Sequence, residues 1–346
     1  MQTSPPSRRY LFLYGGPIGD SLVAIHIGRT LAANVPGAVL EMVSTRENSF
    51  VRELCRDLPF IRYRSLPKES LGSWMSLVEL ALSRNASMAY EPVTAVMSLW
   101  WRIILWCMRR RPGGIQLRYQ MQGYEPSVPR GVLRLVYDCE KLNLFDTPKF
   151  VLKAWGIEAR QLPHPSLPPQ PGPGGEPYIL FHFFAGQVRR SIPVKHARDI
   201  LTAARAAYPR HAFVLTCGQG ERERAQRMAA GMSNTRIESG HTAHELTALL
   251  CGADLIVGTT SGIILMATCL RRPIVALYCM SHKQAFMPDF SPETIILSAL
   301  DECRCRPGNG NECRVMTEDG PVYRCLYFVT TEEVLAAMER KLPKDK

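Results

Sequence analysis

Four short segments combine glycines, hydroxyl residues and charged residues in patterns that suit chemistry on a phosphorylated ligand. In the first, "GGPIGD", Gly15, Gly16 and Gly19 precede Asp20 directly after an apolar run. Glycines at such a place allow a tight turn and a close approach of the backbone to a ligand. Asp20 then has two readings, as the cap of the helix that follows or as a carboxylate that takes a proton from an acceptor hydroxyl.

The second segment, "FHFFAGQVRRSIP", places adjacent arginines Arg189 and Arg190 in a loop after an apolar strand pattern. Guanidinium groups at such a position can bind a phosphate through paired N–H groups. The alternative is that both arginines are surface charges ahead of a helix.

In the third segment, "LTCGQGERERAQRM", a strand pattern ends at Gly218 and Gly220, and Glu221 opens a helical pattern. A carboxylate after a strand can accept hydrogen bonds from a ribose diol. It can equally be an acidic residue that the first turn of a helix favours for electrostatic reasons.

The fourth segment, "DLIVGTTSGIILMATCL", has Thr260, Ser261 and Gly262 between a buried strand pattern and an apolar helix. Exposed N–H groups at a helix start, with small hydroxyl side chains beside them, make an anion site. An ordinary Ser or Thr cap is the competing interpretation. Because so apolar a helix must be buried, its start has a fixed position, which favours the phosphate site.

The cysteines give only a weak indication of a metal site. The chain has 11 cysteines, and several lie inside apolar runs, which predicts reduced, buried thiols in a cytoplasmic protein. The set near the C-terminus lacks the usual Cys-x-x-Cys spacing of zinc sites, so we expect structural thiols and no bound metal. That set is Cys303, Cys305, Cys313 and Cys325.

The elements that must position these residues alternate between strand and helix patterns. Residues 10–16 and 38–45 predict buried strands, and residues 20–37 and 49–58 predict helices, which indicates a parallel α/β sheet. Residues 70–160 are expected to be mostly helical.

A second alternation follows the Pro- and Gly-rich stretch "LPHPSLPPQPGPGGEP". We therefore predict an N-terminal Rossmann-like domain over 1–165, a linker over 166–177 and a C-terminal Rossmann-like domain over 178–346. Ligands of such sheets bind beyond the carboxyl ends of the strands, so the two domains are expected to face each other across a cleft.

Charge and missing motifs narrow the class of function. A net charge of +11 suits a phosphate-bearing partner, an anionic membrane surface or nucleic acid, but no nucleic-acid-binding motif is present. The opening turn is neither a Gly-x-Gly-x-x-Gly motif nor a P-loop. No signal peptide is expected. Residues 94–114, with three tryptophans and a closing Arg109-Arg110-Arg111, fit either a helix in a membrane interface or a buried helix.

The order of these segments resembles the heptosyltransferase-like glycosyltransferases of family nine. The resemblance rests on "GGPIGDSLVA", "YPRHAFVLTCGQGERERA", "HTAHELTALLCGADLIVGTTSG" with "RRPIVALY", and the tail "CRCRPGNGNECRVM…CLYFVTTEEV". It implies a GT-B fold and inverting transfer of a sugar, usually heptose from its ADP derivative, to a lipopolysaccharide core. It also implies an anionic glycolipid acceptor and no cofactor or metal. For such an enzyme, residues 94–114 and the basic N-terminal half suggest a cytoplasmic protein with peripheral contact at the inner face of the inner membrane.

Residue by residue, the resemblance makes Asp20 the presumed general base. Arg190 lies near the family's lysine that contacts donor phosphates, and Glu221 matches the glutamate near the nucleoside. The family's aspartate and histidine at the phosphate loop are replaced here by Thr260 and Leu265. These departures keep one alternative open, a catalytically impaired relative that binds sugar nucleotides or glycans as a scaffold. A separate alternative is a nucleotide-dependent epimerase or dehydrogenase, against which the absence of a Gly-x-Gly-x-x-Gly motif weighs.

Overall fold

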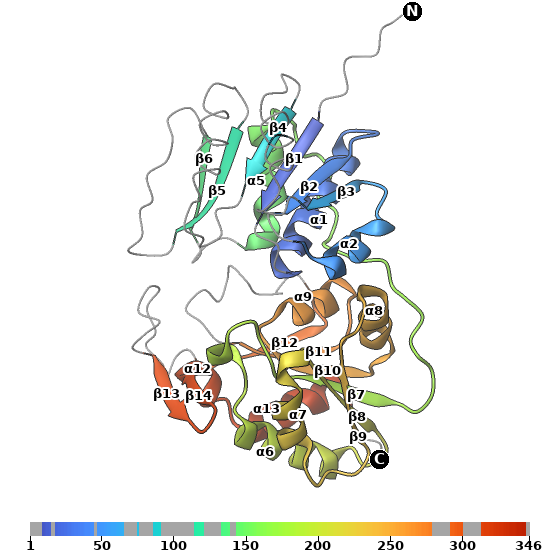
Figure 1. The fold of residues 1–346 in the computed structure, drawn as a ribbon, viewed down its shortest axis with the longest axis vertical. Coiled ribbons are helices and arrows are strands. Elements are labelled where there is room, and N and C mark those ends of the chain that lie inside the picture. Colours follow the sequence, from blue (N-terminus) through green and yellow to red (C-terminus); the bar gives the residue numbers. More distant parts are fainter. Residues whose placement is uncertain are drawn as a thin grey trace, which may run out of the picture. The chain divides into compact units, whose positions relative to one another are not determined.

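The computed structural model contains two compact units, Met1–Pro165 and Ser166–Lys346. It describes residues 9–14, 18–44, 47–65, 75, 86–90, 114–120, 133–138, 143–278, 291–299 and 313–343. Each unit is built on a six-stranded sheet (Figure 1). All neighbouring strands in both sheets run parallel, as expected from the alternation of strand and helix patterns.

The first unit has the strand order β3-β2-β1-β4-β5-β6. This is the order of dinucleotide-binding Rossmann folds, in which the direction of winding reverses beside the first strand. Its strands are β1 (Arg9–Tyr14), β2 (Leu40–Ser44), β3 (Ile61–Ser65), β4 (Ala86–Tyr90), β5 (Gly114–Gln120) and β6 (Leu133–Asp138). Its described helices are α1 (Ile18–Asn34), α2 (Ser49–Arg56), the short 3-10 helix η1 (Leu144–Asp146) and α5 (Thr147–Ala154).

The expectation that residues 70–160 are mostly helical is wrong in the part that the structure describes. Strands β4, β5 and β6 all lie in this range, and its described helical residues are Met75 and those of η1 and α5. The sequence of β5, GIQLRYQ, alternates apolar and polar residues, which is the period of a strand and not of a helix.

Helix α1 carries Asp20, the candidate base, and packs in the core of the first unit. Its residues 21–28 are all buried, because the helix packs against the sheet and against α5. The ring of Tyr10 on β1 lies 5.2 Å from that of Trp155, just after α5, which adds aromatic packing to the same core. The helix ends before Pro36, which cannot continue it, and Gly37, whose φ of 75° favours glycine.

The second unit has the order β12-β11-β10-β7-β8-β9, the same winding as the first. Its strands are β7 (Tyr178–His182), β8 (Ala212–Cys217), β9 (Thr235–Ser239), β10 (Leu255–Thr259), β11 (Ile274–Leu277) and β12 (Thr294–Leu297), with a separate hairpin of β13 (Arg314–Thr317) and β14 (Gly320–Tyr323). Its helices are η2 (Val188–Arg190), α6 (Val194–Ala207), η3 (Gln219–Glu221), α7 (Arg222–Ala229), α8 (Ala243–Gly252), α9 (Gly262–Cys269), α12 (Arg324–Tyr327) and α13 (Thr331–Lys341).

Helices cover both faces of the second sheet. Helices α6, α7 and α13 pack together on one face, and α8 and α9 pack together on the other (Figure 1). Strand β7 is buried at all five positions, so it is a nearly continuous apolar run in the sequence. Ile179 and Phe181 belong to the core shared with α6 and α13.

The Pro- and Gly-rich stretch predicted as a linker over 166–177 lies within the second unit. The buried Leu167 donates its N–H to the carbonyl of Cys269 at 3.2 Å. Gly172 packs so closely on Gly252 that a Cβ atom at Gly172 would lie 2.7 Å from the Gly252 Cα atom. The first part of this stretch is therefore packed against α8 and the end of α9.

The thiols differ from the expectation at one position. Cys55, Cys217, Cys251, Cys269 and Cys325 are not in disulfides, but Cys313 is disulfide-bonded. Neither the odd cysteine count nor the apolar context of single cysteines indicates such a pairing.

Gly258 allows β10 to lie close to β7 and α9, which leads to a prediction about stability. A Cβ atom there would lie 2.6 Å from the carbonyl oxygen of His182 and 2.7 Å from Cδ1 of Ile264. We expect Gly258→Ala to lower the free energy of unfolding by about 1–3 kcal/mol, measured by urea unfolding. Gly186→Ala is the control, since a Cβ atom at Gly186 meets nothing within 4 Å. Equal stability of the two variants would contradict this packing argument.

Candidate functional site

The strand order of the second unit places its candidate site at the carboxyl ends of β7 and β10. These strands are neighbours, and the chain winds in opposite directions from them, which is the place in an open α/β sheet where ligands typically bind. The loop after β7, residues 183–193, contains Arg190. The loop after β10 contains Thr260 and Ser261.

The two loops are joined directly. The hydroxyl of Thr259, the last residue of β10, donates to the carbonyl oxygen of Arg190 at 2.7 Å. The loop after β7 is also closed on itself, because Ile192 donates its N–H to Phe183 at 2.9 Å. The Ser191 hydroxyl oxygen accepts the N–H of Ala185 at 3.1 Å. The backbone that carries Arg190 is therefore fixed beside the start of α9.

Arg189 and Arg190 have different surroundings, although the sequence suggested that they act as a pair. The guanidinium of Arg189 lies 5.4 Å from the centre of the Tyr323 ring on β14, in a cation–π arrangement. Arg190 is partly buried, and its Nε atom has no hydrogen-bond partner among the described residues. A buried N–H donor without a partner is rare, which favours Arg190 as the arginine available to an anion.

At the start of α9, Ser261 is the helix cap. Its hydroxyl oxygen accepts the N–H of Ile264 at 3.3 Å, so the competing interpretation from the sequence is correct for this side chain. Thr260 is buried and donates its N–H to the carbonyl of Leu277 at 3.2 Å. Because Ser261 accepts the N–H of Ile264, the N–H groups of Gly262 and Ile263 are the ones of this turn that we consider for an anion. Residues 264–269 are all buried, which keeps this helix start in place.

Glu221 lies at the carboxyl end of β8, next to β7 in the sheet. It is the last residue of η3, and α7 begins at the following residue, where the sequence suggested that Glu221 itself opens a helix. One carboxylate oxygen accepts the N–H of Gly218 at 2.8 Å, which closes this turn. The contact fixes the carboxylate at the edge of the sheet that also carries Arg190.

His182 ends β7 directly behind this edge. Its Nδ1 atom lies 3.1 Å from the carbonyl oxygen of Thr216, so the proton must be on Nδ1 for this contact to be a hydrogen bond. Burial lowers the pKa of His182 to about 4. At neutral pH the ring is therefore an uncharged part of the wall behind the site.

This burial predicts how stability depends on pH. Because the pKa of His182 is about 4 in the folded protein and 6.5 in its ordinary state, the unfolded chain binds more protons between these values. The contribution of His182 to the free energy of unfolding is fully present above pH 6.5. On acidification toward pH 4 this contribution falls by about 1.4 kcal/mol per pH unit. Urea unfolding at pH 7 and 5 measures the change. A variant His182→Asn with the same pH slope as wild type would contradict this assignment.

Asp20 lies in the first unit, as the third residue of α1. It is partly buried and lies inside the first helical turn, not at the cap position that the sequence suggested. A carboxylate in a first turn is stabilised by the partial positive charge of the helix start. Gly19 is the second residue of the same helix, and Gly15 and Gly16 lie outside the described residues.

Two further expectations, on a metal site and on a membrane-interface helix, concern residues that lie partly outside the described part of the chain. Within it, no group of three or more His, Cys, Asp or Glu side chains could hold a metal ion. Cys303 and Cys305 lie outside it. No described helix has both the length and the hydropathy needed to span a bilayer. The segment 94–114 also lies outside the described residues, apart from Gly114, which begins β5.

Residues 119–315 match the sequence model of glycosyltransferase family 9 (heptosyltransferase). The chain belongs to this family. It is therefore a glycosyltransferase of the heptosyltransferase type, as its resemblance to that family implied. No curated protein matches the chain by sequence.

Solved structures similar to this family 9 glycosyltransferase share its fold over nearly the whole chain. Escherichia coli ADP-heptose lipopolysaccharide heptosyltransferase II is 18% identical with a TM-score of 0.68, over 96% of this chain and 98% of that one. A family 9 glycosyl transferase from Veillonella parvula DSM 2008 is 16% identical with a TM-score of 0.70, over 97% of each chain. E. coli heptosyltransferase WaaC with ADP is 15% identical with a TM-score of 0.62, over 96% and 99%. The family 9 chain accordingly has the GT-B fold that the sequence predicted.

Proposed function

We propose that this family 9 glycosyltransferase moves heptose or a related sugar from ADP-heptose to a lipopolysaccharide core or another surface glycolipid. The choice of nucleotide is supported by the E. coli relative of the same fold, which has been solved with ADP and with ADP-2-deoxy-2-fluoro heptose. The observation that carries the proposal is the hydrogen bond from the Thr259 hydroxyl to the Arg190 carbonyl oxygen, which fixes the backbone of Arg190 beside the start of α9.

The donor diphosphate would bind at this edge. As the bond between the anomeric carbon and the diphosphate oxygen breaks, its electron pair goes to the diphosphate, where negative charge builds up. The N–H groups at the start of α9 and the Arg190 guanidinium can stabilise that charge without reorganising. Glu221, held at the end of β8, would accept hydrogen bonds from the ribose of the nucleoside.

The acceptor hydroxyl would be activated by Asp20. Its carboxylate takes the hydroxyl proton while the acceptor oxygen forms a bond to the anomeric carbon on the face opposite the departing diphosphate. This single displacement inverts the anomeric centre. It uses protein dipoles and charged side chains for both proton transfer and charge stabilisation, so we propose that it proceeds without a bound metal. Activity unchanged by a chelator would support this part of the proposal.

A thermal-shift screen with ADP-, UDP-, GDP- and CMP-sugars tests the donor. A ligand that binds only the folded protein raises its melting temperature, by an amount that grows with ligand concentration over Kd. We expect the largest rise with ADP-heptose. A rise with another nucleotide alone would contradict the choice of ADP, and no rise with any of them would contradict the proposed function.

One observation favours a second function, that of a sugar-nucleotide-binding relative without transfer activity. Leu265, at the position where the family carries a histidine, is buried in α9, and the Thr260 hydroxyl lies 3.5 Å from the Leu277 carbonyl oxygen. Neither side chain can supply the family's polar contacts to the donor. Release of ADP that depends on a truncated lipopolysaccharide acceptor supports transfer, whereas donor binding without such release supports the binding role.

We also propose contact with the inner face of the inner membrane through residues 94–114. The three tryptophans and the arginines of this segment suit a lipid interface, and a net charge of +11 suits anionic headgroups. We expect the protein to float with vesicles that contain anionic lipid at low salt, and less so at high salt. Failure to float at low salt would contradict the contact.

A further inference from the structure

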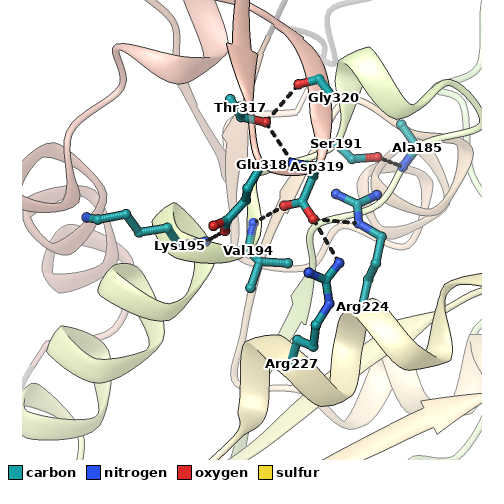
Figure 2. A network of polar contacts seen from close by, with 10 residues as sticks. All are labelled: Ala185, Ser191, Val194, Lys195, Arg224, Arg227, Thr317, Glu318, Asp319 and Gly320. Carbon is teal, nitrogen blue, oxygen red and sulfur yellow. Dashed lines mark hydrogen bonds and ion pairs between the residues drawn. The ribbon is translucent and has the colours of Figure 1, made fainter.

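One buried carboxylate, Asp319, contacts two helices of the second unit (Figure 2). Its side chain is 1% exposed. One oxygen accepts the N–H of Val194, the first residue of α6, at 2.6 Å. The other accepts from Nη2 of Arg227 on α7 at 2.9 Å, and Nε of Arg224 on the same helix lies 3.8 Å away. Val194 is 125 residues from Asp319 in the chain, so the contact is entirely tertiary.

The hairpin of β13 and β14 presents this carboxylate in a fixed way. Gly320, which follows Asp319 in the turn, has φ of 105°, a conformation that favours glycine. The Thr317 hydroxyl donates to the carbonyl of Gly320 at 2.8 Å and accepts the N–H of Asp319 at 3.3 Å. The neighbouring Glu318 accepts the N–H of Lys195 at the longer distance of 3.3 Å.

Helix α6 needs such a contact because it has no cap of its own. Pro193 occupies the cap position without a side-chain hydrogen bond, and the first turn of α6 has no acidic residue. The carboxylate of Asp319 satisfies an N–H group of that turn and complements its partial positive charge. Since the loop 183–193 runs directly into α6, this contact fixes the end of the loop that carries Arg190.

The carboxylate of Asp319 also forms ion pairs with arginines of the second helix, α7. Helix α7 begins directly after Glu221, and its Arg224 lies with its guanidinium 5.6 Å from the ring of Phe184 in the loop 183–193. Apart from the ion pair with Asp319, the Nε and Nη2 atoms of Arg224 have no hydrogen-bond partner among the described residues. Asp319 therefore joins the helix that follows Arg190 to the helix that follows Glu221.

We propose that Asp319 is a positioning residue that aligns the Arg190 loop, residues 183–193, with the Glu221 loop, residues 218–221. The inference rests on the proposed function, in which these loops bind the diphosphate and the nucleoside of one donor. It adds to that function a distant residue on which the shape of the donor site depends. Removing the carboxylate lets the two loops move independently, and misplacement of a binding group by about 1 Å can lower activity about a hundredfold.

Two variants and one control test the proposal in the full chain. Asp319→Asn keeps the size of the side chain and an oxygen for the Val194 N–H, but ends the charge pairing with Arg227. Arg227→Ala removes the other half of that pair from a side chain that is 50% exposed, so it is a milder change to the core. Glu318→Gln is the control, because it alters the adjacent, more distant carboxylate of the same turn.

We expect Asp319→Asn and Arg227→Ala to raise the Kd for ADP-heptose, measured by calorimetry, at least about tenfold, while Glu318→Gln stays near wild type. A merely structural role would lower the melting temperature of Asp319→Asn and leave the Kd of the folded fraction unchanged. An unchanged Kd in both variants would therefore overturn the proposal, whatever their stability.

Hydrogen exchange in the ligand-free protein separates this proposal from the function on which it rests. We expect the amides of 183–193 and 218–221 to exchange faster in Asp319→Asn than in Glu318→Gln. If wild type binds no nucleotide sugar, the proposed function fails, and exchange alone then decides the role of Asp319. Faster exchange in both loops supports positioning, and exchange equal to that of wild type overturns it.

Discussion

Asp20→Asn is expected to lose most sugar transfer while keeping the fold and the affinity for the donor. The asparagine has the same shape, and the buried residues of α1 that pack in the core begin at Ser21, after Asp20. What it lacks is a group that can take the acceptor proton, and such help is typically worth about 100–10,000-fold in rate. The measurement is kcat for ADP release with a truncated lipopolysaccharide acceptor, beside the Kd for ADP-heptose.

The matched control for Asp20 is Asp146→Asn. Asp146 lies at the cap position of α5, also in the first unit, and its carboxylate pairs with Lys149 at 2.6 Å on the surface. We expect its removal to leave kcat within about twofold of wild type, because exposed ion pairs contribute little. Near-normal turnover in Asp20→Asn, or an equal loss in both variants, would remove Asp20 from the role of base.

Arg190→Ala is expected to have the second large effect, on both donor affinity and rate. The Arg190 guanidinium has a buried Nε without a partner among the described residues, so little of the fold depends on its contacts. Loss of one preorganised donor to a developing anion typically costs about 100–1,000-fold in kcat. We expect a loss in this range, together with a higher Kd for ADP.

The adjacent Arg189 provides the control for Arg190. It has the same charge, but its guanidinium packs on the Tyr323 ring. We therefore expect Arg189→Ala to change stability slightly and donor binding little. If the two variants lose ADP affinity equally, the effect is one of general charge, and Arg190 has no particular place in the donor site.

Much of the fold of the second unit could be predicted from the sequence, because its signals are local. The run "YILFHFF" is β7, and the pattern after Pro193 is α6, since a buried strand and an amphipathic helix each have a clear period. The glycines and hydroxyl residues after β8 and β10 also indicated which loops lie at the sheet edge. Parallel winding then places these loops at one edge without further information.

The parts that could not be predicted depend on contacts between distant segments. The different surroundings of Arg189 and Arg190 depend on Tyr323, more than a hundred residues later in the chain, because its ring contacts only the Arg189 guanidinium among the described cation–π pairs. The role of Asp319 depends on Val194 and Arg227 in the same way. Only its turn has a local signal, the Asp-Gly pair between strand-forming residues, which is typical of a β-hairpin.

The most direct test of the account is a crystal structure of the protein with ADP. We predict that the diphosphate lies within about 3 Å of the first N–H groups of α9 and of the Arg190 guanidinium, with the ribose toward Glu221. A diphosphate bound elsewhere in the molecule, away from the carboxyl ends of β7 and β10, would contradict the proposed donor site and the mechanism built on it.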